Sequence, residues 1–193
     1  MYSLYLDSSN VELIVGLVKD NVKIDETSYE AWQRQSEYMI LEIDKILKRN
    51  NVSPKEIEEV VTTRGPGSYT GVRISLTIAK IYAYSRNIPL YLLSSLEVEK
   101  KDNELSLCLM NARSGRSYVG IYHQDKTILA DCILTNDEVK KYIDEGKYAI
   151  CGDTGYLDIK STTGDIINNM IQIKLESAPC ENVLAAKPVY LKD

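Results

Sequence analysis

Residues 63–73 read TRGPGSYTGVR, and this stretch decides how the whole chain is interpreted. Its centre is a turn made of Gly65, Pro66 and Gly67. Proline presets the first central angle of a type II turn and glycine accepts the positive φ of the second, so the sequence predicts that turn here. Ser68 or Thr70 can then cap a helix that starts directly after it.

The turn raises the question of a bound phosphate, because free N–H groups at a helix N-terminus can hold an anion. It matches neither the GxxxxGK[ST] loop nor the GxGxxG loop of nucleotide-binding proteins. Two interpretations stay open from the residues alone: a phosphate-binding loop, and a structural turn that shapes the start of the helix. The missing motifs favour the structural turn.

The helix predicted from Thr70 to about Arg86 has more apolar surface than a helix with a single buried stripe needs. One narrow stripe holds Arg73, Thr77, Lys80 and Tyr84, and small residues recur elsewhere at Gly71, Ser75, Ala79 and Ala83. Small side chains at every fourth position let a neighbour approach closely. Either the helix is clamped between its own sheet and a neighbouring helix, or part of it docks on another protein.

Outward from this helix, the N-terminal half reads as an α/β unit. A three-stranded meander is predicted at residues 3–7, 11–18 and 23–30, followed by a helix over 30–49. Strands at 59–63 and 89–93 flank the central helix, which makes a βαβ unit with parallel neighbouring strands. A capping box at residues 53–56 starts a short helix.

A polar run at residues 100–104 marks the predicted boundary between two lobes, 1–99 and 100–193. The second lobe is predicted to contain a hairpin, a further strand, a capped helix that Gly146 closes, and another strand. Their ranges are 105–110, 118–122, 126–134, 135–146 and 148–151. A strand at 171–175 and a short helix near 181–186 are predicted after them.

The composition of the 193 residues limits the classes of function. The formal net charge is −5 and the basic residues are scattered, so the chain lacks the basic face of a protein that holds nucleic acid by itself. No signal peptide and no run of roughly 20 apolar residues is visible, which predicts a cytoplasmic protein without membrane contact. One histidine and four scattered cysteines fit no zinc spacing, so we expect no metal and no cofactor.

The segment RGPGSYTGVRISLTIAK at residues 64–80, followed by NIPLYLLSSLEV at 87–98, closely resembles the signature of the bacterial TsaB (YeaZ) family. Tyr69 replaces the family's usual phenylalanine, and Ser75 stands where glycine is common. The match is long, and it is more specific than a lone glycine motif.

Weaker similarity to the family is spread over the rest of the chain. It covers LYLDSS at residues 4–9, the helix at 32–47, MNARSGRSYVGIY at 110–122 and the closing PVYLKD at 188–193. Gln35 stands in the place of a family histidine, and Asn111 in the place of an aspartate. The resemblance therefore covers the N-terminal half well and the C-terminal half in patches.

The resemblance implies an α/β fold of the actin-like (ribonuclease H-like) type, with two lobes and a reduced C-terminal lobe. It also implies a role in forming the threonylcarbamoyl group on the adenosine next to the anticodon of tRNA. In that role the chain is a non-catalytic scaffold partner of TsaD, a catalytic paralogue, and a TsaE-like ATPase joins the pair. The chain meets tRNA only through this complex.

The resemblance also suggests which residues matter. The partner interface is predicted at Tyr38, Leu41, Gly71, Ser75, Ile78, Ala79 and Tyr82. The signature loop is predicted to comprise Gly65, Pro66, Gly67, Ser68, Tyr69, Thr70 and Arg73. Because a face meant for a paralogue can accept a second copy of the chain, we expect a homodimer when the partner is absent.

An alternative function is an actin-like ATPase or kinase with its own nucleotide site. That site would use Asp7 with the glycine turns at residues 65–67 and 152–155. No glycine follows Asp7 until Gly16, which makes close backbone approach to a phosphate harder. A second lobe of about 90 residues also looks too short to complete a nucleotide cleft. A metallopeptidase fits less well, since no HExxH motif is present.

Overall fold

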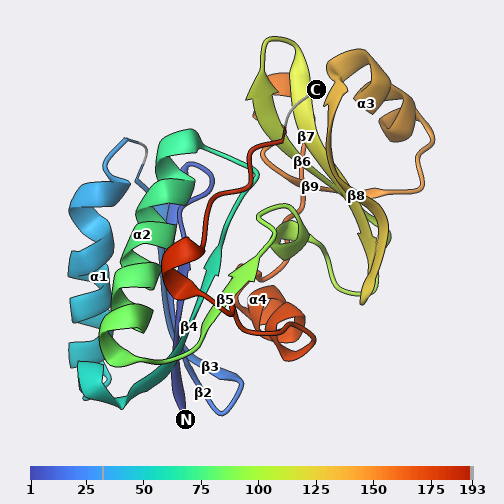
Figure 1. Cartoon of the computed structure of the whole chain (residues 1–193). Helices are drawn as coiled ribbons and strands as arrows, with labels where there is room; N and C mark the ends of the chain where they lie inside the picture. Colours follow the sequence, from blue (N-terminus) through green and yellow to red (C-terminus); the bar gives the residue numbers. More distant parts are fainter. Residues whose placement is uncertain (32, 192–193) are drawn as a thin grey trace.

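The computed structural model describes residues 1–31 and 33–191, which fold into two lobes that are each built on a separate sheet (Figure 1). The first sheet consists of β1 (Tyr2–Asp7), β2 (Glu12–Lys19), β3 (Val22–Glu30), β4 (Ile57–Thr63) and β5 (Leu90–Leu93). Its order is β3-β2-β1-β4-β5. The strands β1, β2 and β3 form the predicted antiparallel meander, and β4 pairs in parallel with both β1 and β5.

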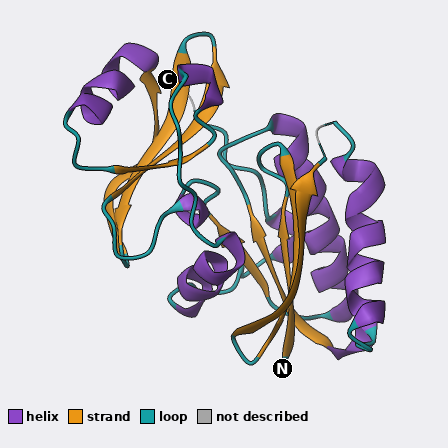
Figure 2. Cartoon of the chain, turned by 180° about the vertical axis from the view of Figure 1, so that it is seen from behind, coloured by secondary structure: helices purple, strands orange, loops and turns teal. Residues whose placement is uncertain are grey.

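Two helices, α1 (Gln35–Arg49) and α2 (Tyr69–Arg86), lie side by side on one face of this sheet (Figures 1 and 2). The unit β4–α2–β5 is the predicted βαβ crossover, so that prediction is confirmed. The helix predicted from residue 30 begins at Gln35, after Gln33 adopts a positive φ of 63°. The predicted capping box at 53–56 is present, but it starts a single 3₁₀ turn, Pro54–Glu56. No helix in residues 1–31 and 33–191 is long and apolar enough to span a membrane.

The second sheet repeats the topology of the first on a smaller scale. It consists of β6 (Ser106–Arg113), β7 (Arg116–His123), β8 (Lys126–Thr135) and β9 (Ala149–Gly152), in the order β8-β7-β6-β9. Again a meander is followed by a helix, α3 (Asn136–Asp144), and by a strand parallel to the first. Thr135 and Glu138 form the predicted capping box of α3. An equivalent of β5 is missing from this sheet, which is why the second lobe is the smaller one.

The C-terminal residues leave the second lobe and return to the first. The helix α4 (Ile166–Leu175) packs on the sheet face opposite α1 and α2, where Ile167, Met170 and Ile171 join the core around Tyr5. The strand predicted at 171–175 is therefore wrong. The apolar side chains follow the i, i+3, i+4 spacing of a helix that starts at Asp165, whose carboxylate accepts a hydrogen bond from the Asn168 N–H.

The helix α4 is held on the first sheet by a buried ion pair. Lys174 Nζ lies 2.6 Å from Glu59 Oε1, and the two side chains are 7% and 4% exposed. Ser3 Oγ donates a second hydrogen bond to the same carboxylate over 2.7 Å. This pair connects the end of the chain to β1 and β4.

The tail that follows α4 runs back along α2 toward the signature loop (Figure 1). The short helix predicted near 181–186 is a single 3₁₀ turn, Val183–Ala185. Lys80 Nζ donates to two carbonyl oxygens of the tail, and Val189 N donates to Arg64 O over 2.7 Å. The predicted division at residue 100 separates the two sheets, whereas residues 166–191 belong to the first lobe by contact.

Candidate functional site

The signature loop is bound to the turn between β1 and β2. Ser68 N donates to Ser9 O over 2.7 Å, and Ser8 Oγ donates to Gly71 O over 2.8 Å. Of the two residues predicted to cap the helix, Ser68 does so, since its Oγ accepts a hydrogen bond from Gly71 N. The loop and the β1–β2 turn thus form one continuous surface.

The glycines of this loop are required by packing within the chain. A Cβ atom on Gly71 would lie 1.8 Å from Ser8 O, and one on Gly67 would lie 2.5 Å from Ser9 O. The predicted type II turn is wrong, because φ of Gly67 is 156° instead of about 80° and the Gly65–Pro66 peptide is cis. The loop is shaped to press against the β1–β2 turn.

The second conserved-looking segment, SSLEV, anchors the same loop and joins the lobes. Ser95 exchanges hydrogen bonds with Gly65: its Oγ accepts from Gly65 N and its backbone N donates to Gly65 O, both over 3.1 Å. Ser94 Oγ donates to Asp131 Oδ2 over 2.6 Å, and Asp131 lies on β8 of the other lobe. Neighbouring serines therefore connect one lobe's loop to the other lobe's sheet.

Arg73, at the start of α2, is engaged by the chain's own tail. Its Nε donates to Tyr190 Oη over 2.6 Å, and its guanidinium carbon lies 4.0 Å from the centre of the Tyr69 ring. The rings of Tyr69 and Tyr190 stack with 5.4 Å between centroids. Because these contacts occupy one flank of α2, that flank is covered from within the molecule.

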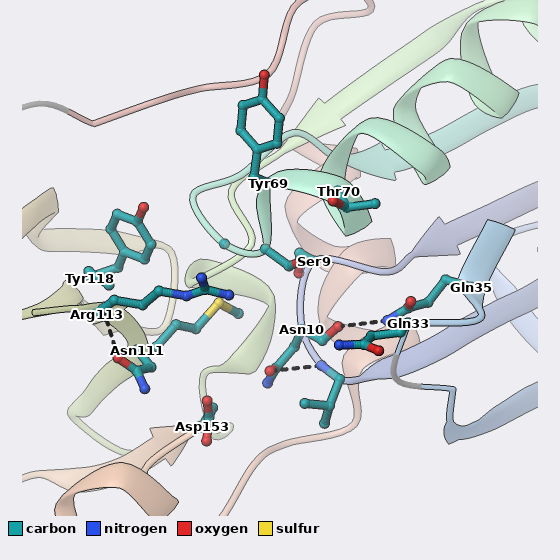
Figure 3. A pocket seen from close by; sticks show the side chains of 15 residues that line it. Ser9, Asn10, Gln33, Gln35, Tyr69, Thr70, Asn111, Arg113, Tyr118 and Asp153 are labelled. Carbon is teal, nitrogen blue, oxygen red and sulfur yellow. Dashed lines mark hydrogen bonds between the residues drawn. The ribbon is translucent and has the colours of Figure 1, made fainter.

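A cleft of about 740 Å³ lies between the lobes, with the start of α2 on one side and the β6–β7 hairpin on the other (Figure 3). It is lined by Ser9, Asn10, Val11, Gln33, Gln35, Gly67, Ser68, Tyr69, Thr70, Met110, Asn111, Ala112, Arg113, Tyr118 and Asp153. The cleft lies beyond the carboxyl ends of β1, β6 and β9, the usual position for ligands in α/β sheets. The signature-loop residues Gly67–Thr70 are part of it, whereas Gly65, Pro66 and Arg73 do not line it.

Asp7, the residue that a nucleotide site would use, lies beneath the floor of the cleft. Its carboxylate accepts hydrogen bonds from Ser9 N and Thr63 Oγ1, and it is 3% exposed. Burial raises the pKa of Asp7, although these hydrogen bonds oppose the shift. Burial, followed by the nearby Asp7 carboxylate, raises the pKa of Glu99 to about 8. Two buried acids therefore share the region where the lobes meet.

Three of the seven residues predicted to face a partner are buried inside the lobe. Gly71, Ser75 and Ala79 all lie on the inner side of α2, and the last two are 0% exposed. The stripe of small residues therefore serves close packing within the chain. Tyr38 and Tyr82 are half-buried: Tyr38 packs edge to face on a neighbouring ring, and Tyr82 donates to Pro54 O over 2.8 Å.

The outer surfaces of α1 and α2 carry large apolar side chains. Ile40, Leu41 and Ile81 are 61%, 51% and 64% exposed. Ile74, Ile78, Ile81 and Tyr82 follow an i, i+4, i+7, i+8 spacing, which places them on one stripe of α2. We define the α1–α2 face as Ile40, Leu41, Ile74, Ile78, Ile81 and Tyr82. The sequence analysis missed Ile40, since apolar residues off the buried stripe carry no mark of their exposure.

Comparison with known proteins gives consistent results. Residues 29–171 match the family model described as TsaD: tRNA N6-adenosine threonylcarbamoyltransferase. The tRNA threonylcarbamoyladenosine biosynthesis protein TsaB of Bacillus subtilis is 31% identical over 137 residues, which span 69% of this chain and 60% of that relative. The uncharacterized protein MG208 of Mycoplasma genitalium is 26% identical over 202 residues, with 100% of this chain and 95% of that protein covered.

Solved structures agree on the fold. YeaZ from Pseudomonas aeruginosa superposes with a TM-score of 0.81 at 20% identity, over 98% of this chain and 99% of that one. The architecture is thus the actin-like, ribonuclease H-like two-lobe fold that the sequence predicted.

Proposed function

Because this chain belongs to the TsaB (YeaZ) family, we propose that it is a non-catalytic scaffold in the formation of threonylcarbamoyladenosine in tRNA. Its partner is a TsaD-type transferase, and a TsaE-like ATPase joins the pair in the cytoplasm. The match to the Bacillus subtilis relative spans 60% of that protein's length, so the activity is carried over here as a proposal.

The α1–α2 face is the observation that carries this proposal. Ile40, Leu41 and Ile81 expose more than half of their surface on two adjacent helices. Clustered exposed apolar side chains mark protein-binding surfaces in soluble proteins. The small-residue side of α2 is packed inward and the tail covers another flank, so the outer side of the two helices is the surface left for a partner.

The non-catalytic part of the proposal is supported by the chemistry of the cleft and the charge of the chain. Asp7 is enclosed by its own hydrogen bonds, and no group of three or more His, Cys, Asp or Glu side chains in residues 1–31 and 33–191 could hold a metal ion. The net charge of −5 fits a subunit that meets tRNA through its complex and not alone.

Depletion of the protein tests the function. We expect the threonylcarbamoyladenosine content of total tRNA, measured by mass spectrometry of nucleosides, to fall after depletion. Wild-type protein should restore it, and so should Ile128→Glu, which changes a 58% exposed isoleucine on the distant β8. Ile81→Glu should restore it poorly. An unchanged content of the modified nucleoside in depleted cells would refute the proposed role.

The same face predicts the behaviour of the chain without its partner. A second copy can cover the α1–α2 face in a symmetric dimer, since such an interface uses the same patch twice. We expect sedimentation velocity to show a dimer at tens of micromolar for the wild type and for Ile128→Glu, and a monomer for Ile81→Glu. A wild-type monomer throughout that range would contradict the homodimer.

A further inference from the structure

The charges in the interlobe cleft form a pattern that the scaffold role does not use. Of the fifteen side chains that line the cleft, only Arg113 and Asp153 are charged. Neither side chain makes a hydrogen bond or an ion pair with the residues that the structure describes. We infer that the cleft binds a small zwitterion, a molecule with a carboxylate at one end and an ammonium group at the other.

Arg113 supplies the site for the carboxylate. A register shift between Asn111 and Arg113 marks a bulge at the end of β6, and bulges of this kind redirect side chains. Arg113 has a φ of 65°, and its side chain extends from the hairpin toward the wall that carries Ser9 and Asn10 (Figure 3). A guanidinium binds a carboxylate through two parallel hydrogen bonds, which a water molecule cannot replace with equal geometry.

The start of α2 adds to this positive end. Ser68 caps the helix through Gly71 N, which leaves the backbone N–H groups of Tyr69 and Thr70 without a partner in the described chain. These groups belong to residues that line the cleft, and the helix behind them is 18 residues long. The aligned peptide dipoles favour a negative group at this end.

Asp153 supplies the site for the ammonium group. It directly follows β9, whose last residue, Gly152, pairs with Leu109 on β6. The parallel pairing of β6 and β9 therefore brings Asp153 and Arg113 to the same end of the sheet. They do not pair with each other, so a ligand that carries both opposite charges satisfies both groups at once.

Neutral amides line the space between and opposite these charges. Asn10 and Asn111 each accept a backbone hydrogen bond through Oδ1, so their Nδ2 groups stay available (Figure 3). Gln33 and Gln35 lie on the same wall as Asn10. A polyanion such as a nucleoside triphosphate would meet one cation and one repelling carboxylate here, whereas a zwitterion meets a net charge of zero.

The test is a titration of the full chain by calorimetry or NMR with zwitterions of increasing charge separation: glycine, diglycine and triglycine. Acetate and methylammonium serve as the two halves, and inorganic phosphate tests for a general anion site. We expect one of the glycine series to bind at least about tenfold more tightly than acetate, methylammonium or phosphate. Arg113→Gln and Asp153→Asn should each weaken that binding about tenfold or more.

The control is Lys140→Gln, which removes an exposed positive charge from α3 in the same lobe and should leave the affinity unchanged. Zwitterions that bind no better than acetate would overturn the inference. Tighter binding in Asp153→Asn, or tightest binding of phosphate, would show an anion site instead and would overturn it as well. Neither result bears on the α1–α2 face, so the scaffold proposal is tested separately.

Discussion

At the scale of single residues, Gly71 makes the most specific prediction. Its missing Cβ would lie 1.8 Å from the carbonyl oxygen of Ser8, and a backbone atom cannot move aside without shifting β1. We expect Gly71→Ala to lower the free energy of unfolding by about 2–3 kcal/mol or more, measured by urea denaturation. Gly155→Ala is the matched control, because its nearest neighbour would be 4.0 Å away. Equal midpoints for the two variants would contradict the packing account.

Glu99 makes a prediction about pH. Its pKa of about 8 in the folded chain lies above the ordinary value of about 4.3, so the folded state keeps a proton that the unfolded state has lost. The stability that this proton contributes is complete below about pH 4.3 and is lost as the pH rises to about 8. We expect Glu99→Gln to gain stability over the wild type across this range, by a few kcal/mol, and then to level off. A constant difference between pH 4 and pH 9 would contradict the assignment.

Residue patterns indicated chemistry better than they indicated neighbours. The cap at Ser68 could be predicted because a serine before a helix needs only local geometry. The repeat at Gly71, Ser75 and Ala79 announced a close approach, but a sequence does not show whether the approaching atoms belong to the same chain. The atoms turn out to be the chain's own, since all three residues are buried.

At the scale of elements, the docking of α4 depends on the pair of Lys174 and Glu59. Lys174→Ala leaves the Glu59 carboxylate buried without its cation, and we expect a loss of about 3–5 kcal/mol. Lys48→Ala is the control, because its pair with Asp44 is exposed and contributes about 0.5 kcal/mol or less. Thermal or urea unfolding measures both.

The reason for the loss can be tested with a double variant. Replacing the pair by Glu59→Leu with Lys174→Met removes the buried charge altogether, and we expect it to recover most of the stability. A double variant as unstable as Lys174→Ala would show that the ion pair holds α4 by more than charge compensation.

Among the elements, those with local signals were predicted and α4 was not. The crossover around α2 follows from a capped apolar helix between two short apolar runs. In α4, the five residues 171–175 alternate like a strand, and the helical spacing shows only when Ile167 and Met170 are included. A ten-residue helix that is buried on one face of a distant sheet gives a weak local pattern.

At the scale of the whole molecule, the two lobes have the same topology and differ in their last helix. In the first lobe α2 covers its own sheet, whereas α4 follows the fourth strand of the second lobe and packs on the first sheet. The cleft depends on this arrangement, because Arg113 and Asp153 face the start of α2 across the lobe boundary. Such a site could not be predicted from local patterns, since its residues come from five separate segments.

The central claim is that the α1–α2 face binds a TsaD-type sister protein. The most direct measurement is isothermal calorimetry of this chain with the TsaD-type transferase of the same cell. We predict a stable complex for the wild type and for Ile128→Glu, and an affinity at least about tenfold weaker for Ile81→Glu, whose side chain is 64% exposed and not needed for folding. Equal affinity for all three proteins, each shown to be folded by circular dichroism, would contradict the account.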